Sequence, residues 1–143
     1  MRQKAILDTG PLVALLDRRD DLHSWATQTF RAIQYPLLTC EPVITEACFL
    51  LSSTYGAQEA VMSLIKRGAI EINFSLSNHA DELSKLIVQY SSVPMSLADA
   101  CLVKMAELHK NRVLVTFDSD FQIYRMNRTQ LISLIMPENQ RDY

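Results

Sequence analysis

Four acidic residues that lie far apart in the chain are the strongest candidates for chemistry. They are Asp8, Glu46, Asp99 and Asp118. Gathering them in one place is costly, because like charges repel and each carboxylate loses hydration. A divalent cation removes that cost, and Mg²⁺ and Mn²⁺ prefer oxygen ligands. The acids therefore predict a metal site of the kind that recurs in enzymes that cleave phosphodiesters.

Two of these acids follow short apolar runs that predict buried strands. Residues 5–7 lead directly into Asp8, and residues 113–115 end shortly before Asp118. In an open parallel sheet, ligands bind beyond the carboxyl ends of the strands. We therefore expect Asp8 and Asp118 to lie at the same edge of the sheet. The other two acids lie in predicted helices among apolar or small neighbours, so we expect them to face inward.

Short apolar segments alternate with helical patterns along the whole chain. This alternation predicts an α/β fold in which helices cover both faces of a parallel sheet. Ser77 and Ser96 are expected to open helices. Further strands are expected at about residues 36–40, 70–76 and 131–135. Helices are expected at about residues 11–16, 22–33, 41–51, 57–66, 77–90 and 96–108. We assign residues 1–136 to one domain and residues 137–143 to a polar tail.

The composition sets limits on the class of protein. The chain has 143 residues, which suits one domain, and 48% of them are hydrophobic, which is enough to fill a core. The formal net charge is -2, so a nucleic-acid partner has to be argued from a site rather than from bulk charge. Three cysteines without a C-x-x-C pair favour reduced thiols. No signal peptide or membrane span is recognisable, and we expect a soluble, cytoplasmic protein with no membrane partner.

Each acid also fits a purely local role. Asp8, before Thr-Gly-Pro, fits a helix cap. Asp99, three residues after a serine, fits a capping box. Glu46 fits a solvated helical surface, and Asp118 fits an Asx turn. These interpretations do not exclude a metal site, because a cap at the start of a helix can also offer its carboxylate to an ion.

Four short motifs occur in an order that resembles the PIN-domain nucleases, specifically the small single-domain proteins of the VapC toxin type. The first motif is the strand and turn at residues 6–15, and the second is the helix at residues 42–47. The third is Leu-Ala-Asp-Ala at residues 97–100, and the fourth is the segment at residues 115–121. Together with the strand that begins at Ala5, the motifs extend over most of the chain.

The resemblance implies a three-layer αβα fold with a central parallel sheet of four or five strands flanked by helices. It implies an acidic site that binds one or two Mg²⁺ or Mn²⁺ ions, RNA as the substrate, a homodimer, and a small antitoxin that blocks the pocket. The metal-binding acids would be Asp8, Glu46, Asp99 and Asp118. Asp120 falls on a further acidic position that assists Asp118 or takes its place, and Thr9 and Thr116 fall on small polar positions beside the acids.

The activity that the resemblance implies is that of a metal-dependent endoribonuclease, and the VapC-type motifs also admit a role as the toxin of a toxin–antitoxin pair. A metal-activated water would attack phosphorus and leave a 5′-phosphate and a 3′-hydroxyl. RNA contact requires cations despite the negative net charge. The candidates for this contact are Arg18, Arg19, Lys104 and Arg125.

Two other functions compete with this one. The first is a non-catalytic RNA-binding or interaction module on the same fold, although the acids are present at all four positions. The second is an aspartate-nucleophile phosphatase, because Asp8 follows the first strand of an α/β sheet. Such phosphatases typically have a second aspartate two residues later, where this chain has Gly10.

Overall fold

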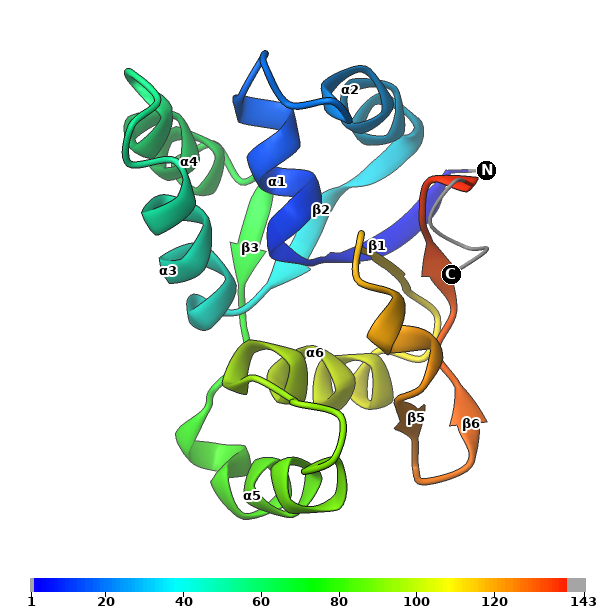
Figure 1. Cartoon of the computed structure of the whole chain (residues 1–143). Coiled ribbons are helices and arrows are strands. Elements are labelled where there is room, and N and C mark those ends of the chain that lie inside the picture. Colours follow the sequence, from blue (N-terminus) through cyan, green and yellow to red (C-terminus); the bar gives the residue numbers. More distant parts are fainter. Residues whose placement is uncertain (1, 139–143) are drawn as a thin grey trace.

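A five-stranded parallel sheet forms the centre of the protein. The computed structural model describes residues 2–138, and its strands lie in the order β3-β2-β1-β4-β7 (Figure 1). Every neighbouring pair in this sheet is parallel. The strands are β1 (Gln3–Leu7), β2 (Ile33–Thr39), β3 (Ile70–Ile72), β4 (Val113–Val115) and β7 (Leu134–Ile135). The α/β class and the parallel sheet expected from the sequence are confirmed.

Helices connect the strands and lie on both sides of the sheet. Figure 1 shows α5 and α6 together on one side and the first four helices on the other. The helices are α1 (Thr9–Leu16), α2 (His23–Ala32), α3 (Glu41–Leu50), α4 (Ala57–Lys66), α5 (Ala80–Gln89) and α6 (Leu97–Leu108). Two short 3₁₀ turns are η1 (Ser77–His79) and η2 (Ser119–Gln122).

The period of two residues along each strand divides the core into two layers. Ile6 pairs with Leu114, and both pack into the cluster that contains most of α6. Leu7 pairs with Val115, and both pack into the cluster formed with α1 and α2. Because the central strands are buried on both faces, they appear in the sequence as continuous apolar runs.

The last predicted strand was placed wrongly in part. Only Leu134–Ile135 joins the sheet, whereas Leu131 belongs to an antiparallel hairpin formed by β5 (Arg125–Met126) and β6 (Gln130–Leu131). The turn of the hairpin holds Asn127 and Arg128 at positive φ. Leu131 is 67% exposed, so this apolar residue is not part of the core.

Three other boundaries also differ from the prediction. β2 begins at Ile33, which was expected to end a helix, and not at residue 36. β3 ends at Ile72 instead of continuing to residue 76. Ser77 does not cap a helix, because it lies inside η1 and α5 begins only at Ala80. Ser96, by contrast, is the N-cap of α6 as expected.

Two further expectations concern the thiols and the tail. Cys40, Cys48 and Cys101 are all unpaired, as expected. Among residues 2–138, no helix is both long enough and apolar enough to cross a bilayer. Most of the predicted polar tail, residues 139–143, lies outside the described residues.

Candidate active site

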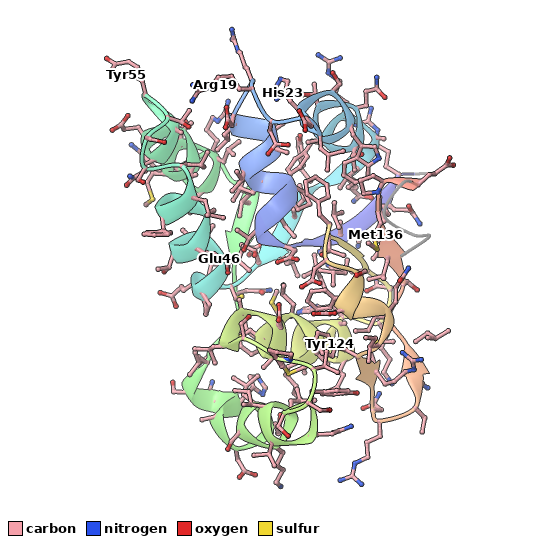
Figure 2. All side chains as sticks on the ribbon, viewed as in Figure 1. Arg19, His23, Glu46, Tyr55, Tyr124 and Met136 are labelled. Carbon is pink, nitrogen blue, oxygen red and sulfur yellow. The ribbon has the colours of Figure 1, made fainter. Side chains whose placement is uncertain are left out.

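One pocket at the carboxyl edge of the sheet brings the four predicted acids together. Its volume is about 360 Å³. Its lining consists of Asp8, Thr9, Gly10, Glu46, Ser96, Asp99, Phe117 and Asp118. The acids come from the ends of two adjacent strands and from two helices, and Figure 2 shows Glu46 on α3 near the start of α6.

Asp8 is the most buried of these acids, with 8% of its surface exposed. It follows β1 directly and is the N-cap of α1. Its Oδ1 accepts a hydrogen bond from the Thr9 backbone N–H at 2.7 Å, and its Oδ2 accepts one from the Thr116 hydroxyl at 2.6 Å. The carboxylate is therefore oriented by both its own helix and the neighbouring strand β4.

Asp118 is held by a second set of backbone contacts. Its N–H donates to Thr116 Oγ1 at 2.9 Å, and its Oδ1 accepts from the Asp120 N–H at 2.9 Å. This is the Asx turn that the sequence suggests, and it caps η2. The Thr116 hydroxyl thus joins Asp118 to Asp8.

Asp99 caps its own helix and also lines the pocket. The Ser96 hydroxyl accepts from the Asp99 N–H at 3.0 Å, while Asp99 Oδ2 accepts from the Ser96 N–H at 3.1 Å. This reciprocal pair is a capping box. Glu46 differs from the expectation that it faces inward, because it is exposed on α3 although it lines the pocket.

The acids repel one another electrostatically. Burial raises the pKa of Asp8 to about 6, and the charges of Asp99 and Asp118 add to this effect against the opposing hydrogen bonds. Burial also raises the pKa of Asp99, with further contributions from Asp118 and Glu46. The pKa of Asp120 is raised by burial and by Asp118. Among residues 2–138, none of the ion pairs includes an acid of the pocket.

The donors in the pocket suit a hard divalent cation, because they are carboxylates without a cationic partner. Thr9 adds a buried hydroxyl that lines the pocket and has no hydrogen-bond partner. Within the described residues, no three acidic, histidine or cysteine side chains already surround one point as a ready-made metal site. The donor chemistry therefore fits a cation that keeps part of its hydration, as Mg²⁺ usually does.

Gly10 and Phe117 form the apolar wall of the pocket, and sequence reasoning did not assign either of them to the site. A Cβ atom on Gly10 would lie 2.8 Å from Phe117 Cδ2, so α1 can approach this ring only with glycine at that position. The Phe117 ring packs edge-on against Trp25, with the ring centroids 5.4 Å apart. The sequence signal for them is their place in the motifs at residues 6–15 and 115–121, where Gly10 follows Asp8 by two residues and Phe117 directly precedes Asp118.

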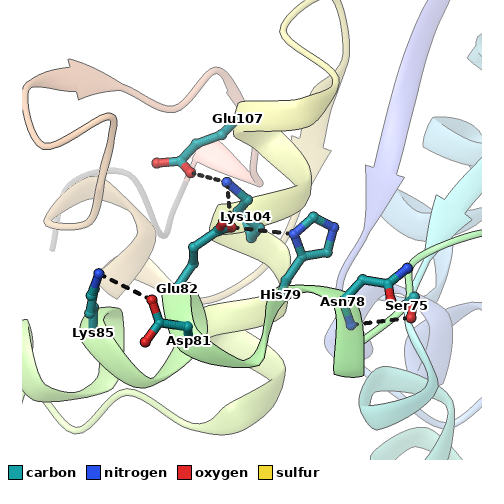
Figure 3. Close-up of polar contacts among 8 residues, drawn as sticks. All are labelled: Ser75, Asn78, His79, Asp81, Glu82, Lys85, Lys104 and Glu107. Carbon is teal, nitrogen blue, oxygen red and sulfur yellow. Dashed lines mark hydrogen bonds and ion pairs between the residues drawn. The ribbon is translucent and has the colours of Figure 1, made fainter.

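The four predicted RNA-binding cations do not line the pocket. Lys104 Nζ lies 2.8 Å from Glu82 and 3.5 Å from Glu107, in the contacts between α5 and α6 that Figure 3 shows. Arg125 donates to three nearby backbone carbonyls. Arg18 and Arg19 are exposed beyond the end of α1. A role for any of them in RNA binding remains a prediction.

Comparison with known proteins agrees with this architecture. Residues 5–126 match the family model of the PIN domain. Ribonuclease VapC26 of Mycobacterium tuberculosis is 24% identical over 115 residues, which cover 79% of this chain and 85% of that protein. The crystal structure of Mycobacterium tuberculosis VapC20, described as a toxin that cleaves the sarcin-ricin loop, superposes with a TM-score of 0.75 at 18% identity. The superposition covers 84% of this chain and 94% of that one. Because the family match extends over most of its length, the chain belongs to the PIN-domain family.

Proposed function

We propose that this chain is an endoribonuclease that hydrolyses RNA phosphodiester bonds, and that it is the toxin of a toxin–antitoxin pair. The observation that carries the proposal is the pocket in which four acids from distant segments meet, none of them in an ion pair within residues 2–138. The similarity to a ribonuclease, VapC26, and to an RNA-cleaving toxin, VapC20, supports RNA as the substrate.

In this proposal, Asp8, Glu46, Asp99 and Asp118 hold one or two Mg²⁺ or Mn²⁺ ions, and Asp120 assists. When bound there, such an ion would supply Lewis-acid chemistry, which would make a water molecule a better nucleophile towards phosphorus. The carboxylates of the pocket carry no covalent step. Their role is to hold cations, because the negative charge of the carboxylates alone would repel the phosphates of RNA.

The role of the chain itself is to orient these ligands in advance. Thr9 and Thr116 fix the two oxygens of Asp8, and Ser96 fixes one oxygen of Asp99. Hydrogen bonds to ligating carboxylates typically change metal affinity by about 10-fold to 100-fold when they are removed. We therefore assign Thr9 and Thr116 a supporting role in metal binding.

The decisive experiment measures cleavage of RNA with Mn²⁺ and with EDTA for the wild type, Asp8→Asn and Asp99→Asn. Asp81→Asn is a matched control, because Asp81 is 84% exposed on α5 and pairs with Lys85 outside the pocket. We expect both pocket variants to lose at least about 100-fold in rate while circular dichroism shows an intact fold. The control should cleave normally. Wild-type rates in Asp8→Asn, or full activity in EDTA, would contradict the proposal.

The competing functions give different results in the same assays. A non-catalytic module would bind RNA without cleaving it, and its Mn²⁺ binding in isothermal titration would equal that of Asp99→Asn. A phosphatase would hydrolyse a generic phosphomonoester and leave RNA intact. The hydrogen bonds to both oxygens of Asp8 argue for a held ligand rather than a free nucleophile.

Two partners complete the proposal, and both rest on the family resemblance. We propose a homodimer, which sedimentation velocity over a range of concentrations would show as a species of twice the chain mass. We also propose a small antitoxin that covers the acidic pocket. Addition of such a protein should abolish cleavage by the wild type and should protect the pocket segments from hydrogen exchange.

A further inference from the structure

Tyr124 carries a buried hydroxyl that has no hydrogen-bond partner. The side chain has 0% of its surface exposed and packs in the core cluster that contains much of α6 (Figure 2). Its ring packs edge-on against Phe121, with the centroids 5.3 Å apart. Buried hydroxyl groups in folded proteins are normally paired, because an unpaired one loses its hydration without compensation. This hydroxyl therefore needs an explanation.

The charged groups that act on this hydroxyl are acids of the candidate site. Burial raises the pKa of Tyr124, and Asp99, Asp120 and Asp118 raise it further in that order. The phenol is therefore protonated at neutral pH, and towards a carboxylate it can act only as a donor. Asp99 is the pocket acid with the largest influence on the hydroxyl, and it raises the pKa of Tyr124 through its charge and through a weak side-chain hydrogen bond that falls short of ordinary distance and angle.

A neighbouring tyrosine shows that the aromatic cluster can satisfy a hydroxyl. The Tyr90 hydroxyl accepts a hydrogen bond from the Arg125 backbone N–H at 3.0 Å. The Tyr90 ring lies 5.0 Å from the Tyr124 ring at an interplanar angle of 70°. The two rings thus pack in one cluster, and they differ in that the Tyr124 hydroxyl, unlike that of Tyr90, has no hydrogen-bond partner of ordinary geometry among residues 2–138.

We propose that Tyr124 is a positioning residue, whose hydroxyl donates a hydrogen bond to the Asp99 carboxylate when the acids hold a divalent cation. The inference rests on the proposed function. In the structure, Asp99 Oδ2 accepts from Ser96 within the capping box, which restrains one oxygen of the carboxylate. A ligating carboxylate is commonly held by an additional donor, and the buried Tyr124 hydroxyl is a donor within weak hydrogen-bonding reach of Asp99. A full hydrogen bond to Asp99 would remove the cost of burying this hydroxyl without a partner.

The test compares Tyr124→Phe with Tyr90→Phe, two substitutions that each remove one hydroxyl from the same cluster. Mn²⁺ affinity is measured by isothermal titration, and thermal unfolding is measured in EDTA. We expect Tyr124→Phe to weaken Mn²⁺ binding by about 10-fold to 100-fold without lowering the metal-free melting temperature. Tyr90→Phe should do the opposite, because it loses an existing hydrogen bond and leaves the acids unchanged.

The outcomes separate this inference from the proposed function. Wild-type Mn²⁺ affinity in Tyr124→Phe overturns the inference and leaves the metal site intact. A lower melting temperature of Tyr124→Phe in EDTA also overturns it, because the hydroxyl would then be paired without metal. Wild-type Mn²⁺ binding no stronger than that of Asp99→Asn overturns the metal site, and the role of Tyr124 with it.

Discussion

Thr116 and Asp8 are 108 positions apart, and the Thr116 hydroxyl donates to Asp8 Oδ2 at 2.6 Å. The contact is possible because β1 and β4 are adjacent parallel strands that end together, with Leu7 paired to Val115. The same hydroxyl accepts from the Asp118 N–H. One threonine therefore joins the two acids that the strand ends contribute to the pocket.

Thr116→Val is expected to impair both stability and metal binding. The substitution keeps the shape of the side chain but leaves Asp8 Oδ2 and the Asp118 N–H without their partner. We expect the free energy of unfolding to fall by about 1–3 kcal/mol. We also expect Mn²⁺ affinity to fall by about 10-fold to 100-fold in isothermal titration.

Thr39→Val is the matched control for this prediction. Thr39 is also fully buried at the end of a strand, and its hydroxyl donates to the Leu7 carbonyl at 2.7 Å. We expect the Thr39→Val variant to lose about as much free energy of unfolding as Thr116→Val and to bind Mn²⁺ with wild-type affinity. Equal metal affinities in the two variants would show that Thr116 does not orient the site.

The stability of the metal-free protein is expected to depend on pH through Asp8. Burial and the neighbouring acids raise the pKa of Asp8 from 3.8 to about 6 in the folded chain, so the folded state binds the proton more tightly than the unfolded state. The resulting contribution to stability is fully present below about pH 4 and is lost as the pH rises through about 6. By linkage, the loss amounts to about 3 kcal/mol.

Asp8→Asn tests this linkage by urea unfolding in EDTA at pH 4 and pH 8. We expect the variant to be more stable than the wild type at pH 8 by up to about 3 kcal/mol, and this difference to disappear at pH 4. Adding Mn²⁺ at pH 8 should stabilise the wild type and have little effect on the variant. A constant difference at both pH values would mean that the Asp8 carboxyl titrates normally.

The acids show why the sequence could predict which distant residues meet in one pocket. Asp8, Asp99 and Asp118 each cap a helix or 3₁₀ turn, as the local interpretation required, and each also lines the pocket. Caps lie at helix starts, and in this fold the starts of α1, α6 and η2 all meet at the carboxyl edge of the sheet. The local interpretations are therefore confirmed, and the same helix starts bring these acids into one pocket, where their role in metal binding and catalysis stays a prediction.

The features that sequence reasoning missed depend on packing between distant segments. The exposed Leu131 looks like a strand residue of the core, but the hairpin turn places it in solvent. The unpaired hydroxyl of Tyr124 and the contact of Gly10 with Phe117 appear only when α1, α6 and η2 are assembled. By contrast, α4 was predicted to the residue, because Gly56 and Gly68 mark its ends locally.

Gly10→Ala is expected to reduce cleavage more than its effect on stability would explain. The new Cβ would lie 2.8 Å from Phe117 Cδ2, so the ring has to move within the wall of the pocket. We expect an RNA cleavage rate about 10-fold to 100-fold lower, with a loss of about 1–3 kcal/mol in the free energy of unfolding.

Gly68→Ala provides the comparison. Gly68 has a φ of +79° and nothing within 4 Å of an added Cβ, so the substitution strains the backbone without touching the site. It should cost about 1–2 kcal/mol of stability and leave the cleavage rate unchanged. If the two variants lose activity in parallel with stability, Phe117 has no special place in the pocket.

Lys104 allows a test of how this chain contacts RNA. The sequence placed Lys104 among the candidates for phosphate contact, but in the structure its side chain is only 17% exposed and is paired with Glu82 and Glu107. Glu107 in turn accepts a hydrogen bond from the Asn127 N–H at 2.7 Å, so the network also holds the β5–β6 turn. We therefore expect Lys104→Met to lower the melting temperature.

RNA binding of Lys104→Met is measured at several salt concentrations in the Asp8→Asn background, where cleavage is expected to be absent. A lysine that contacts a phosphate reduces the slope of log affinity against log salt by about 1 when it is removed. We expect the slope to stay unchanged, because the Lys104 ammonium is already neutralised within the protein. Lys85→Met is the control, since Lys85 is 74% exposed and pairs only with Asp81 at 3.1 Å. It should change neither the slope nor the melting temperature. A reduced slope in Lys104→Met alone would show that Lys104 contacts an RNA phosphate. Its ion pairs with Glu82 and Glu107 would then have to break when RNA binds.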